Sequence, residues 1–398
     1  MKIVEINSVP YGSTGTIANG IAKVANNYGN DTYFCFSWTK YRKKITKENE
    51  MMIGGFFSKL IHIILARFTG LECMFSFFST QRFIKKLKQI NPDVIHIHNL
   101  HCWYINVPLL FKYLKKSRVK VVWTLHDCWS ITGHCPHFEI EQCFKWKKQC
   151  KKCKRYKEYP NCIFDNSKMM YKIKKKNFTS LDSATIITPS NWLANYIKQS
   201  YLNKYNVCVI NNGIDLNIFK KVQSDFKKIH KIENKFMLLG VAYEWNYKKG
   251  IDIIIRLAKD LSDDYAIVLV GTDDKVDKDL PKNIISIHRT NCKEDLVKIY
   301  SAADLFINPT REDTFPTVNI ESLACGTPVI TFKTGGSPEM LNNKCGVVIE
   351  KNNYYSFKNN IENIKSNNPF NQNNCIKQSK KYDMNDKFKE YVDLFNNL

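Results

Sequence analysis

The chain has 398 residues, with 60 Lys+Arg and 37 Asp+Glu, so its formal net charge is +23. At 44% hydrophobic residues it can form large cores, which excludes a disordered chain, and its length suggests two or three domains. Residues 1–200 carry 32 basic and 12 acidic side chains (+20), whereas residues 201–398 carry 28 and 25 (+3). A half-chain at +20 suggests nucleic acid, an anionic membrane surface or an acidic substrate as a partner.

The N-terminal sequence MKIVEI has neither a long apolar core nor a small-residue cleavage site, so we expect no signal peptide. The most apolar stretch, residues 56–83, contains Lys59, Arg67 and Glu72. It therefore lacks the run of ~18 charge-free residues that a membrane-spanning helix requires. We expect a cytoplasmic protein in which the 14 cysteines are reduced.

Short apolar runs typical of buried parallel strands recur along the chain, separated by segments with helical periodicity. They lie at residues 2–6, 93–98, 120–125, 184–188, 207–210, 236–241, 266–270, 284–287, 305–307 and 328–331. This alternation predicts an α/β protein with two doubly wound sheets.

The composition also suggests where the domains begin and end. We expect a first domain over residues 1–218, with a Cys-rich insert at 128–162, and a second domain over residues 219–380. A helix at 381–398 is expected to pack back on the first domain. The Gly-rich residues 12–16 are predicted to form a turn before a helix that begins at Ile17, and the Asn-rich residues 359–374 are expected to be weakly ordered.

The most informative segment is residues 304–332, DLFINPTREDTFPTVNIESLACGTPVITF. A strand is followed by a loop containing Asp313 and by a helix predicted at residues 317–325. The N-terminus of such a helix is an anion site, because its backbone N–H groups are unpaired and its dipole is positive there. Glu321 lies about one turn beyond that N-terminus. Two carboxylates thus flank a phosphate-sized site and can accept hydrogen bonds from sugar hydroxyls.

The D-x7-E pair formed by Asp313 and Glu321, followed by SLACGTPVI, resembles the E-x7-E signature of the retaining family-4 glycosyltransferases. Asp313 stands where that family usually has Glu. Further motifs in the same order, over roughly residues 1–350, are GSTG at 12–15, HD at 126–127, PSNW at 189–192, NGID at 212–215, KG at 249–250 and GGSPE at 335–339. The resemblance implies the GT-B fold, in which two Rossmann-like domains face each other across a cleft.

The resemblance also implies roles for individual residues. His126 and Asp313 are the expected catalytic residues, the first near the transferred sugar or acceptor hydroxyl and the second on the sugar hydroxyls. Glu321 is expected to bind the ribose of the donor. The other expected donor-binding residues, around the diphosphate, are Gly15, Lys248, Lys249, Phe315, Pro316 and Thr317. The family implies catalysis without a bound metal.

These roles imply a hexosyltransferase of class EC 2.4. It would move a hexose from a UDP- or GDP-linked donor to a glycan acceptor, which we expect to be lipid-linked, in capsular or O-antigen-type polysaccharide synthesis. The first domain would take the acceptor and the second the donor. A sugar-nucleotide epimerase of the same fold is one alternative, disfavoured by the KG motif and the D-x7-E pair. A non-enzymatic nucleic-acid-binding protein is the other, but the basic runs match no nucleic-acid-binding motif, so we expect no nucleic-acid partner.

A membrane surface accounts better for the basic half. Residues 56–67 form an amphipathic segment with bulky apolar side chains, and lysines and arginines lie nearby. Such a helix can lie in an anionic interface, which predicts peripheral association with the inner face of the cell membrane. A buried apolar helix with solubilising lysines around it is the alternative.

Six of the 14 cysteines lie within the insert at residues 128–162. Cys150 and Cys153 have zinc-knuckle spacing, and Cys135 and Cys143 could complete a tetrahedral four-thiolate site. The insert lacks a clear periodicity, so a structural zinc would give it a reason to fold. Packed, reduced cysteines are the alternative.

Overall fold

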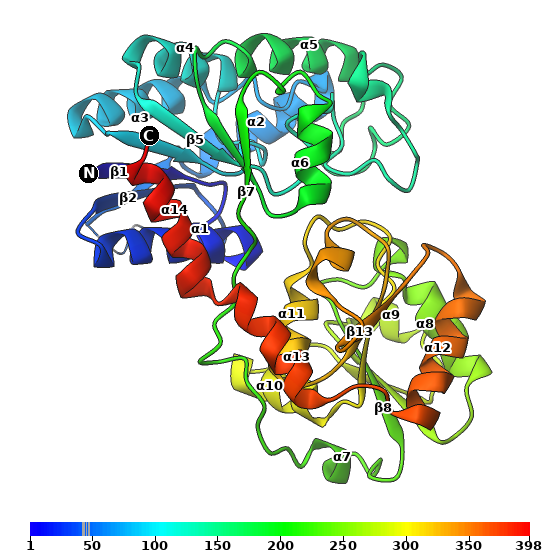
Figure 1. The fold of residues 1–398 in the computed structure, drawn as a ribbon. Coiled ribbons are helices and arrows are strands. Elements are labelled where there is room, and N and C mark those ends of the chain that lie inside the picture. The colour runs from blue at the N-terminus through cyan, green and yellow to red at the C-terminus, as the bar shows by residue number, and fades with distance from the viewer. Residues whose placement is uncertain (42–43, 45, 47) are drawn as a thin grey trace. The chain divides into compact units, whose positions relative to one another are not determined.

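The computed structural model describes residues 1–41, 44, 46 and 48–398. They divide into two compact units, the first made of residues 1–211 and 385–398 and the second of residues 212–384 (Figure 1). The sequence placed the corresponding boundaries after residues 218 and 380. Each unit contains a parallel sheet with helices packed on it, which confirms the predicted fold class of two Rossmann-like domains.

The first unit contains a seven-stranded sheet in the order β3-β2-β1-β4-β5-β6-β7, and every neighbouring pair is parallel. Its strands are β1 (Lys2–Ile6), β2 (Asp31–Ser37), β3 (Glu50–Ile53), β4 (Val94–Ile97), β5 (Lys120–Thr124), β6 (Thr185–Thr188) and β7 (Asn206–Val209). Its helices are α1 (Gly12–Asn27), α2 (Phe56–Thr69), α3 (Phe77–Ile90), α4 (Val107–Ser117), η1 (Lys145–Lys147), α5 (Ser167–Phe178), α6 (Asn191–Lys198) and α14 (Met384–Asn396). The central strands β4 and β6 are buried along their whole length, as expected of a sheet covered on both faces.

The C-terminal helix α14 belongs to the first unit. The ring of Phe388 lies against Gly20 of α1 so closely that a Cβ at residue 20 would be 2.2 Å from it. Tyr391 is 1% exposed and its ring lies 5.4 Å from that of His96 on β4. The last helix therefore completes the first core rather than extending the second.

The second unit contains a six-stranded parallel sheet in the order β10-β9-β8-β11-β12-β13. Its strands are β8 (Phe236–Val241), β9 (Tyr265–Val270), β10 (Ile284–Ile287), β11 (Leu305–Asn308), β12 (Val329–Phe332) and β13 (Gly346–Ile349). Its helices are α7 (Phe226–Ile229), η2 (Tyr247–Lys249), α8 (Ile251–Asp260), α9 (Asp274–Asp277), α10 (Lys293–Ala302), α11 (Thr317–Ala324), η3 (Ser337–Met340), α12 (Tyr354–Asn367), α13 (Gln372–Ser379) and η4 (Lys380–Tyr382).

Each sheet reverses its strand order once, between β1 and β4 in the first unit and between β8 and β11 in the second. The loops that leave the carboxyl ends of two such strands diverge to opposite faces of the sheet and leave a crevice. Ligands of doubly wound folds bind there. The two reversals therefore mark where each unit can hold a ligand.

Two local expectations were wrong. Helix α1 begins at Gly12, not at Ile17, so the Gly-rich residues form its first turns. Helix α12 covers most of the segment expected to be weakly ordered, because Tyr354, Phe357, Ile361 and Ile364 form a buried stripe among its asparagines.

The insert at residues 128–162 has one regular element, the short helix η1. The insert contains no strand and no long helix that would explain why it folds. Among the described residues, no helix combines the length and the apolar character that crossing a bilayer requires.

Candidate active site

In the second unit, the loops after β8 and β11 bring Lys249 and Asp313 together. The ammonium nitrogen of Lys249 lies 2.6 Å from Oδ2 of Asp313. The other carboxylate oxygen, Oδ1, accepts the backbone N–H of Phe315 at 3.2 Å. About a third of the Lys249 side chain and a fifth of that of Asp313 remain exposed, so a ligand can reach both.

The backbone around Lys249 fixes its position. The Asn246 side chain caps η2 by accepting the N–H groups of Lys248 and Lys249 at 3.0 and 3.2 Å. Gly250 follows with φ +77°, and a Cβ there would lie 2.3 Å from the carbonyl oxygen of Pro309. Only glycine allows the two loops to approach this closely.

Arg311 ties the same two loops together. Its guanidinium binds both carboxylate oxygens of Asp252, at 2.6 and 2.8 Å, and the carbonyl of Tyr247 at 2.7 Å. Its backbone N–H donates to the carbonyl of Lys248 at 2.7 Å. The sequence assigned Lys248 to the diphosphate; in the structure its carbonyl accepts this main-chain bond, which anchors the β11 loop.

Glu321 lies on α11, one turn beyond its start, as predicted. The hydroxyl of Tyr300 on α10 donates to its Oε2 at 3.1 Å, and the hydroxyl of Thr317 donates to its Oε1 at 3.3 Å. Burial raises the pKa of the Glu321 carboxyl, and these two hydrogen bonds oppose the rise. They orient the carboxylate, so Tyr300 is a candidate positioning residue that sequence reasoning missed.

The N-terminus of α11 is open to an anion. Its N-cap, Pro316, makes no side-chain cap, and the first turn contains no acidic residue. The loop containing Gly335 covers the preceding residues so tightly that a Cβ at Gly335 would lie 1.7 Å from the carbonyl oxygen of Asp313. The N–H of Gly336 donates to the carbonyl of Thr314 at 2.9 Å. The predicted residues thus lie on one segment, which runs from the β11 loop into α11. They are Asp313, Phe315, Pro316, Thr317 and Glu321.

In the first unit, a chain of buried polar groups runs beside the β1/β4 reversal. Nε2 of His98 lies 2.9 Å from Oε2 of Glu5, and Nδ1 of His98 lies 2.9 Å from Nε2 of His126. His96 Nδ1 approaches the same Glu5 oxygen at 2.8 Å, and its Nε2 meets the hydroxyl of Thr124. The sequence predicted a site residue at His126 in this chain of contacts.

This chain of contacts selects the tautomer of His126. Burial lowers the pKa of His98 to about 3 and that of His126 to about 4, so both are neutral at pH 7. With the Glu5 carboxyl ionised, His98 donates its Nε2–H to Glu5, and its Nδ1 then accepts from Nε2–H of His126. The remaining nitrogen of His126, Nδ1, is therefore a hydrogen-bond acceptor.

Among the described residues, one group of three potential metal ligands has all its ligand atoms within 4.8 Å of one another. It consists of Glu5, His96 and His98. Oε2 of Glu5 lies 2.8 Å from Nδ1 of His96 and 2.9 Å from Nε2 of His98, and the second contact is a hydrogen bond. Ligands of a tetrahedral zinc stand about 3.3 Å apart or more. The group is a hydrogen-bonded network and not a cation cage.

Asp127 lies in a second cluster. Its Oδ2 is 3.0 Å from Nε2 of His101, and His101 Nδ1 is 2.8 Å from the hydroxyl of Tyr159 in the insert. The neighbouring Asp127 and Cys102 hold the pKa of His101 well above its ordinary value despite its burial, and His101 in turn helps to hold the pKa of Asp127 at about 2. A charged His101–Asp127 pair thus stands next to the neutral His126.

Gly15 lies within α1 and not in a loop. A Cβ there would lie 2.6 Å from the carbonyl carbon of Pro10 and 2.8 Å from the carbonyl oxygen of Val9. Its missing side chain therefore lets the β1–α1 loop fold back on the helix. This packing is one reason for a glycine at residue 15. The sequence predicted another, the close approach of the loop to a diphosphate.

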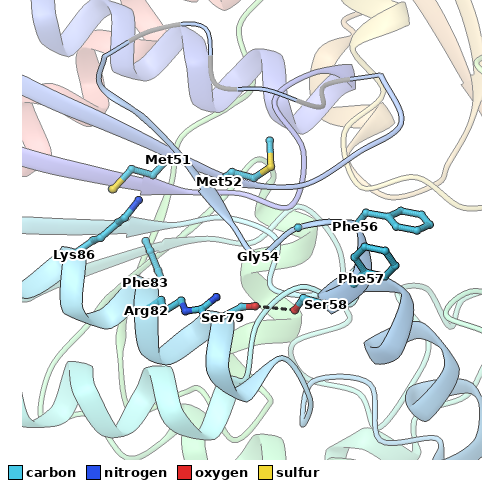
Figure 2. A pocket seen from close by; sticks show the side chains of 11 residues that line it. Met51, Met52, Gly54, Phe56, Phe57, Ser58, Ser79, Arg82, Phe83 and Lys86 are labelled. Carbon is cyan, nitrogen blue, oxygen red and sulfur yellow. Dashed lines mark hydrogen bonds between the residues drawn. The ribbon is translucent and has the colours of Figure 1, made fainter.

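A pocket of about 410 Å³ opens where β3, α2 and α3 meet. Arg82 and Lys86 of α3 line it together with Phe56 and Phe57, and the hydroxyls of its lining residues Ser58 and Ser79 lie 2.7 Å apart (Figure 2).

Beside this pocket, α2 exposes an apolar face. Phe57, Ile61, Ile64 and Phe68 are between 46% and 75% exposed, and they follow one another at helical spacing. The two helices together carry six basic residues and no acidic one. The alternative of a buried apolar helix is wrong, because α2 buries only His62 and Ala66.

Comparisons with known proteins agree with this arrangement. The profile described as "Glycosyl transferases group 1" matches residues 222–382, and the profile "Glycosyltransferase Family 4" matches residues 56–218. The putative colanic acid biosynthesis glycosyl transferase WcaC of Escherichia coli K12 is 26% identical over 268 residues. The match covers 65% of this chain and 64% of WcaC, so just under two thirds of that relative is spanned.

Solved structures share the fold. Sucrose-phosphate synthase of Thermosynechococcus elongatus superposes with a TM-score of 0.71 at 14% identity, over 100% of this chain and 98% of that one. HepE of Anabaena, solved in complex with UDP, superposes with a TM-score of 0.69 at 15% identity, over 100% of both chains.

Proposed function

Because the chain belongs to the GT-B glycosyltransferases of family 4, we propose that it is a retaining hexosyltransferase that builds a surface polysaccharide from a nucleotide-diphosphate sugar. The observation that carries the proposal is the contact of Lys249 with Asp313 in the second unit, just ahead of the start of α11. HepE has also been solved with UDP-glucose, and WcaC is described as a colanic acid enzyme. Both descriptions favour a UDP-linked donor and a polysaccharide product.

The proposed chemistry follows from the charges of Lys249, Asp313 and Glu321 and from the dipole of α11. The diphosphate of the donor binds to the ammonium group of Lys249 and to the N–H groups at the start of α11, and Glu321 accepts from the ribose hydroxyls. As the bond from the anomeric carbon to the phosphate oxygen breaks, negative charge develops on the diphosphate. Preorganised positive groups stabilise that charge by several kcal/mol. Asp313 faces the sugar, whose anomeric carbon becomes oxocarbenium-like.

On the acceptor side, the acceptor hydroxyl attacks from the face that the diphosphate leaves, and a phosphate oxygen takes its proton. The configuration at the anomeric carbon is therefore retained. His126 offers Nδ1 as an acceptor for a hydroxyl of the sugar or of the acceptor, because Nε2–H is held by His98. No metal is required in this scheme, since lysine and the helix dipole neutralise the leaving group.

The acceptor in this proposal is a lipid-linked glycan at an anionic membrane surface. The apolar face of α2 inserts at the level of the headgroups, and the basic residues of α2 and α3 meet the anionic lipids. The pocket that Arg82 and Lys86 line suits the phosphate of a lipid diphosphate, since it opens beside the exposed rings of Phe56 and Phe57. The proposal places the protein peripherally on the inner face of the cell membrane.

Donor binding is tested by thermal unfolding in the presence of UDP- and GDP-linked hexoses. A ligand at 100 times its Kd stabilises the folded protein by about 2.7 kcal/mol, so a true donor raises Tm visibly. The Glu321→Gln variant should lose most of that increase. If no nucleotide or nucleotide sugar changes Tm, the donor assignment is wrong.

Membrane binding is tested by flotation with vesicles that contain anionic lipid. Wild-type protein should float, and added salt should release it. The Phe57→Ser/Ile61→Ser/Phe68→Ser variant should remain at the bottom. A matched control replaces two exposed rings of the second unit, Tyr243→Ser/Tyr355→Ser, and should float like the wild type. Equal flotation of both variants would reject the proposed face.

A further inference from the structure

The insert at residues 128–162 contains no strand, and scattered backbone hydrogen bonds join its turns. Four of its cysteines, Cys135, Cys143, Cys150 and Cys153, line one small cavity of about 20 Å³. A cavity of that size holds a single water or ion. The other two cysteines of the insert, Cys128 and Cys162, do not line it.

The contacts of these four thiols resemble those of a metal knuckle. Cys150 Sγ accepts the N–H of Gly133 at 3.2 Å, and the backbone N–H of Cys153 donates to Oδ2 of Asp165 at 2.8 Å. Such outer hydrogen bonds orient metal ligands. A Cβ at Gly133 would lie 2.7 Å from Cβ of Cys150, so a glycine is required for the backbone to reach this sulfur.

A fifth group that lines the same cavity, His134, has one ring nitrogen without a hydrogen bond. His134 is 7% exposed, and its Nε2 makes no hydrogen bond although it is fully buried. A buried ring nitrogen that is left unpaired destabilises the fold unless something else binds there. Its position beside the four thiols marks this cavity as a place that can hold a polar group or an ion.

We propose that Cys135, Cys143, Cys150 and Cys153 bind one structural zinc ion, with His134 next to the site. Zinc favours four thiolates in a tetrahedron, and the x2 spacing of Cys150 and Cys153 is that of a zinc knuckle. In the described part of the chain, no three of these sulfur atoms lie within 4.8 Å of one another, so the ion would draw them inward.

The charge of the insert fits this assignment. Zinc with four thiolates carries a net charge of −2, because binding sends the four thiol protons to solvent. The insert contains eight basic and three acidic residues, so its own charge of +5 offsets that of the site. The ammonium group of Lys174, which is fully buried, also binds the carbonyls of Trp129 and Thr132 at 2.8 and 3.2 Å beside the knuckle.

By folding the insert, the ion would also fix residues of the first unit near His126, where the acceptor is proposed to bind. Tyr159, at the end of the insert, contacts both Nδ1 of His101 and Sγ of Cys102, and His101 binds Asp127. A folded insert therefore holds the charged His101–Asp127 pair that neighbours His126. Zinc binding itself can be measured without any sugar, so its failure and the failure of the proposed transferase reaction are separate results.

The test is metal analysis of the full-length protein, purified without chelator or added metal. We expect about one zinc per chain. Single Cys→Ser substitutions at the four positions should each lower zinc content at least fivefold, whereas Cys162→Ser, a matched control within the insert, should keep it. A zinc content below about 0.2 per chain in the wild type would overturn the proposal.

Because a Cys→Ser variant can lose zinc by failing to fold, a second measurement uses the wild type alone. Zinc is removed by chelator and replaced with Co²⁺, whose visible absorption reports tetrahedral thiolate coordination. We expect the intense bands of a four-thiolate site at one Co²⁺ per chain, and an unchanged spectrum in His134→Gln. Octahedral cobalt bands, or a spectrum altered in His134→Gln but not in Cys143→Ser, would overturn this ligand set.

Discussion

The ammonium nitrogen of Lys249 lies 2.6 Å from Oδ2 of Asp313, although 64 positions separate the two residues in the chain. The reversal of strand order between β8 and β11 brings their loops together, and Asn246, Gly250 and Arg311 lock them in place. In the proposed reaction this pair spans the bond that breaks, with the lysine on the diphosphate and the aspartate on the sugar.

Removing the lysine should therefore impair the chemical step. We expect Lys249→Ala to lower kcat/KM by ~10²-fold or more, as for other charge-stabilising donors. Lys333→Ala is the matched control in the same unit, because Lys333 forms an exposed pair with Glu350 at 2.8 Å and should change kcat/KM little. Steady-state kinetics with the active nucleotide sugar measures both variants. Near wild-type activity in Lys249→Ala would contradict the assigned role.

Glu321 should act on donor binding through its orientation. Glu321→Ala should lower kcat/KM by ~10²-fold or more. Tyr300→Phe removes only the hydrogen bond to Oε2, so we expect a smaller loss, seen chiefly as a higher KM for the donor. Calorimetric titration of each variant with the nucleoside diphosphate checks the order. A tighter-binding Tyr300→Phe enzyme would show that the bond does not position the carboxylate.

His98 is predicted to be a positioning residue for His126. His98→Phe keeps a ring in the core but removes both hydrogen bonds, so His126 is no longer held with its proton on Nε2. We expect kcat to fall 10- to 100-fold, as for other residues that orient a functional histidine. The Kd for the nucleotide should not change.

If the role of His98 were purely structural, His98→Phe would lower stability. It would not lower kcat while leaving the Kd for the nucleotide unchanged. Glu5→Gln should preserve most activity, since the amide oxygen still accepts from His98. His288→Phe, at an exposed histidine in the second unit, is the control. If His98→Phe and His288→Phe have the same kcat, the positioning role is excluded.

Buried histidines should make the protein sensitive to acid. Burial lowers the pKa of His62 to about 4 and that of His96 to about 3, below the value of about 6.5 in the unfolded chain. Between pH 7 and pH 5 the unfolded chain thus binds protons that the folded chain does not. Each histidine should lower the free energy of unfolding by about 2 kcal/mol over this range.

The matching experiment compares the wild type with His62→Gln at pH 7 and pH 5. Carboxyls with a raised pKa, such as Glu72, act in the opposite direction, so the difference between the two proteins is the quantity to measure. The variant should lose less stability on acidification. Equal losses would show that His62 is protonated in the folded protein.

Much of the fold could be predicted because its signals are local. Strands such as β8 and β10 are continuous apolar runs bounded by polar residues, and the sequence located both to the residue. The strands β2, β3 and β13 were missed. Strand β3 begins with glutamate and β13 with glycine, so neither starts as an apolar run.

The site was predictable only where a motif carried it. Asp313 and Glu321 were found from their spacing, but Tyr300 lies on α10 and reaches Glu321 through packing. Arg311 lies in the same segment as Asp313, but its pairing with Asp252 depends on how the two loops meet. Glu5 and His98 could not be predicted either, because they meet His126 only through the order of β1, β4 and β5 in the sheet. No feature of the isolated sequence reveals a hydrogen bond between residues that are 93 positions apart.

The most direct test of the transferase account follows the first product with water or a glycan as the acceptor. Wild-type protein is incubated with UDP- and GDP-α-linked hexoses, and proton NMR records the anomer that is released or transferred before it equilibrates. The account predicts turnover of one such donor to the α-configured product, lost in Lys249→Ala. A β-configured product, or no turnover of any nucleotide sugar, would contradict it.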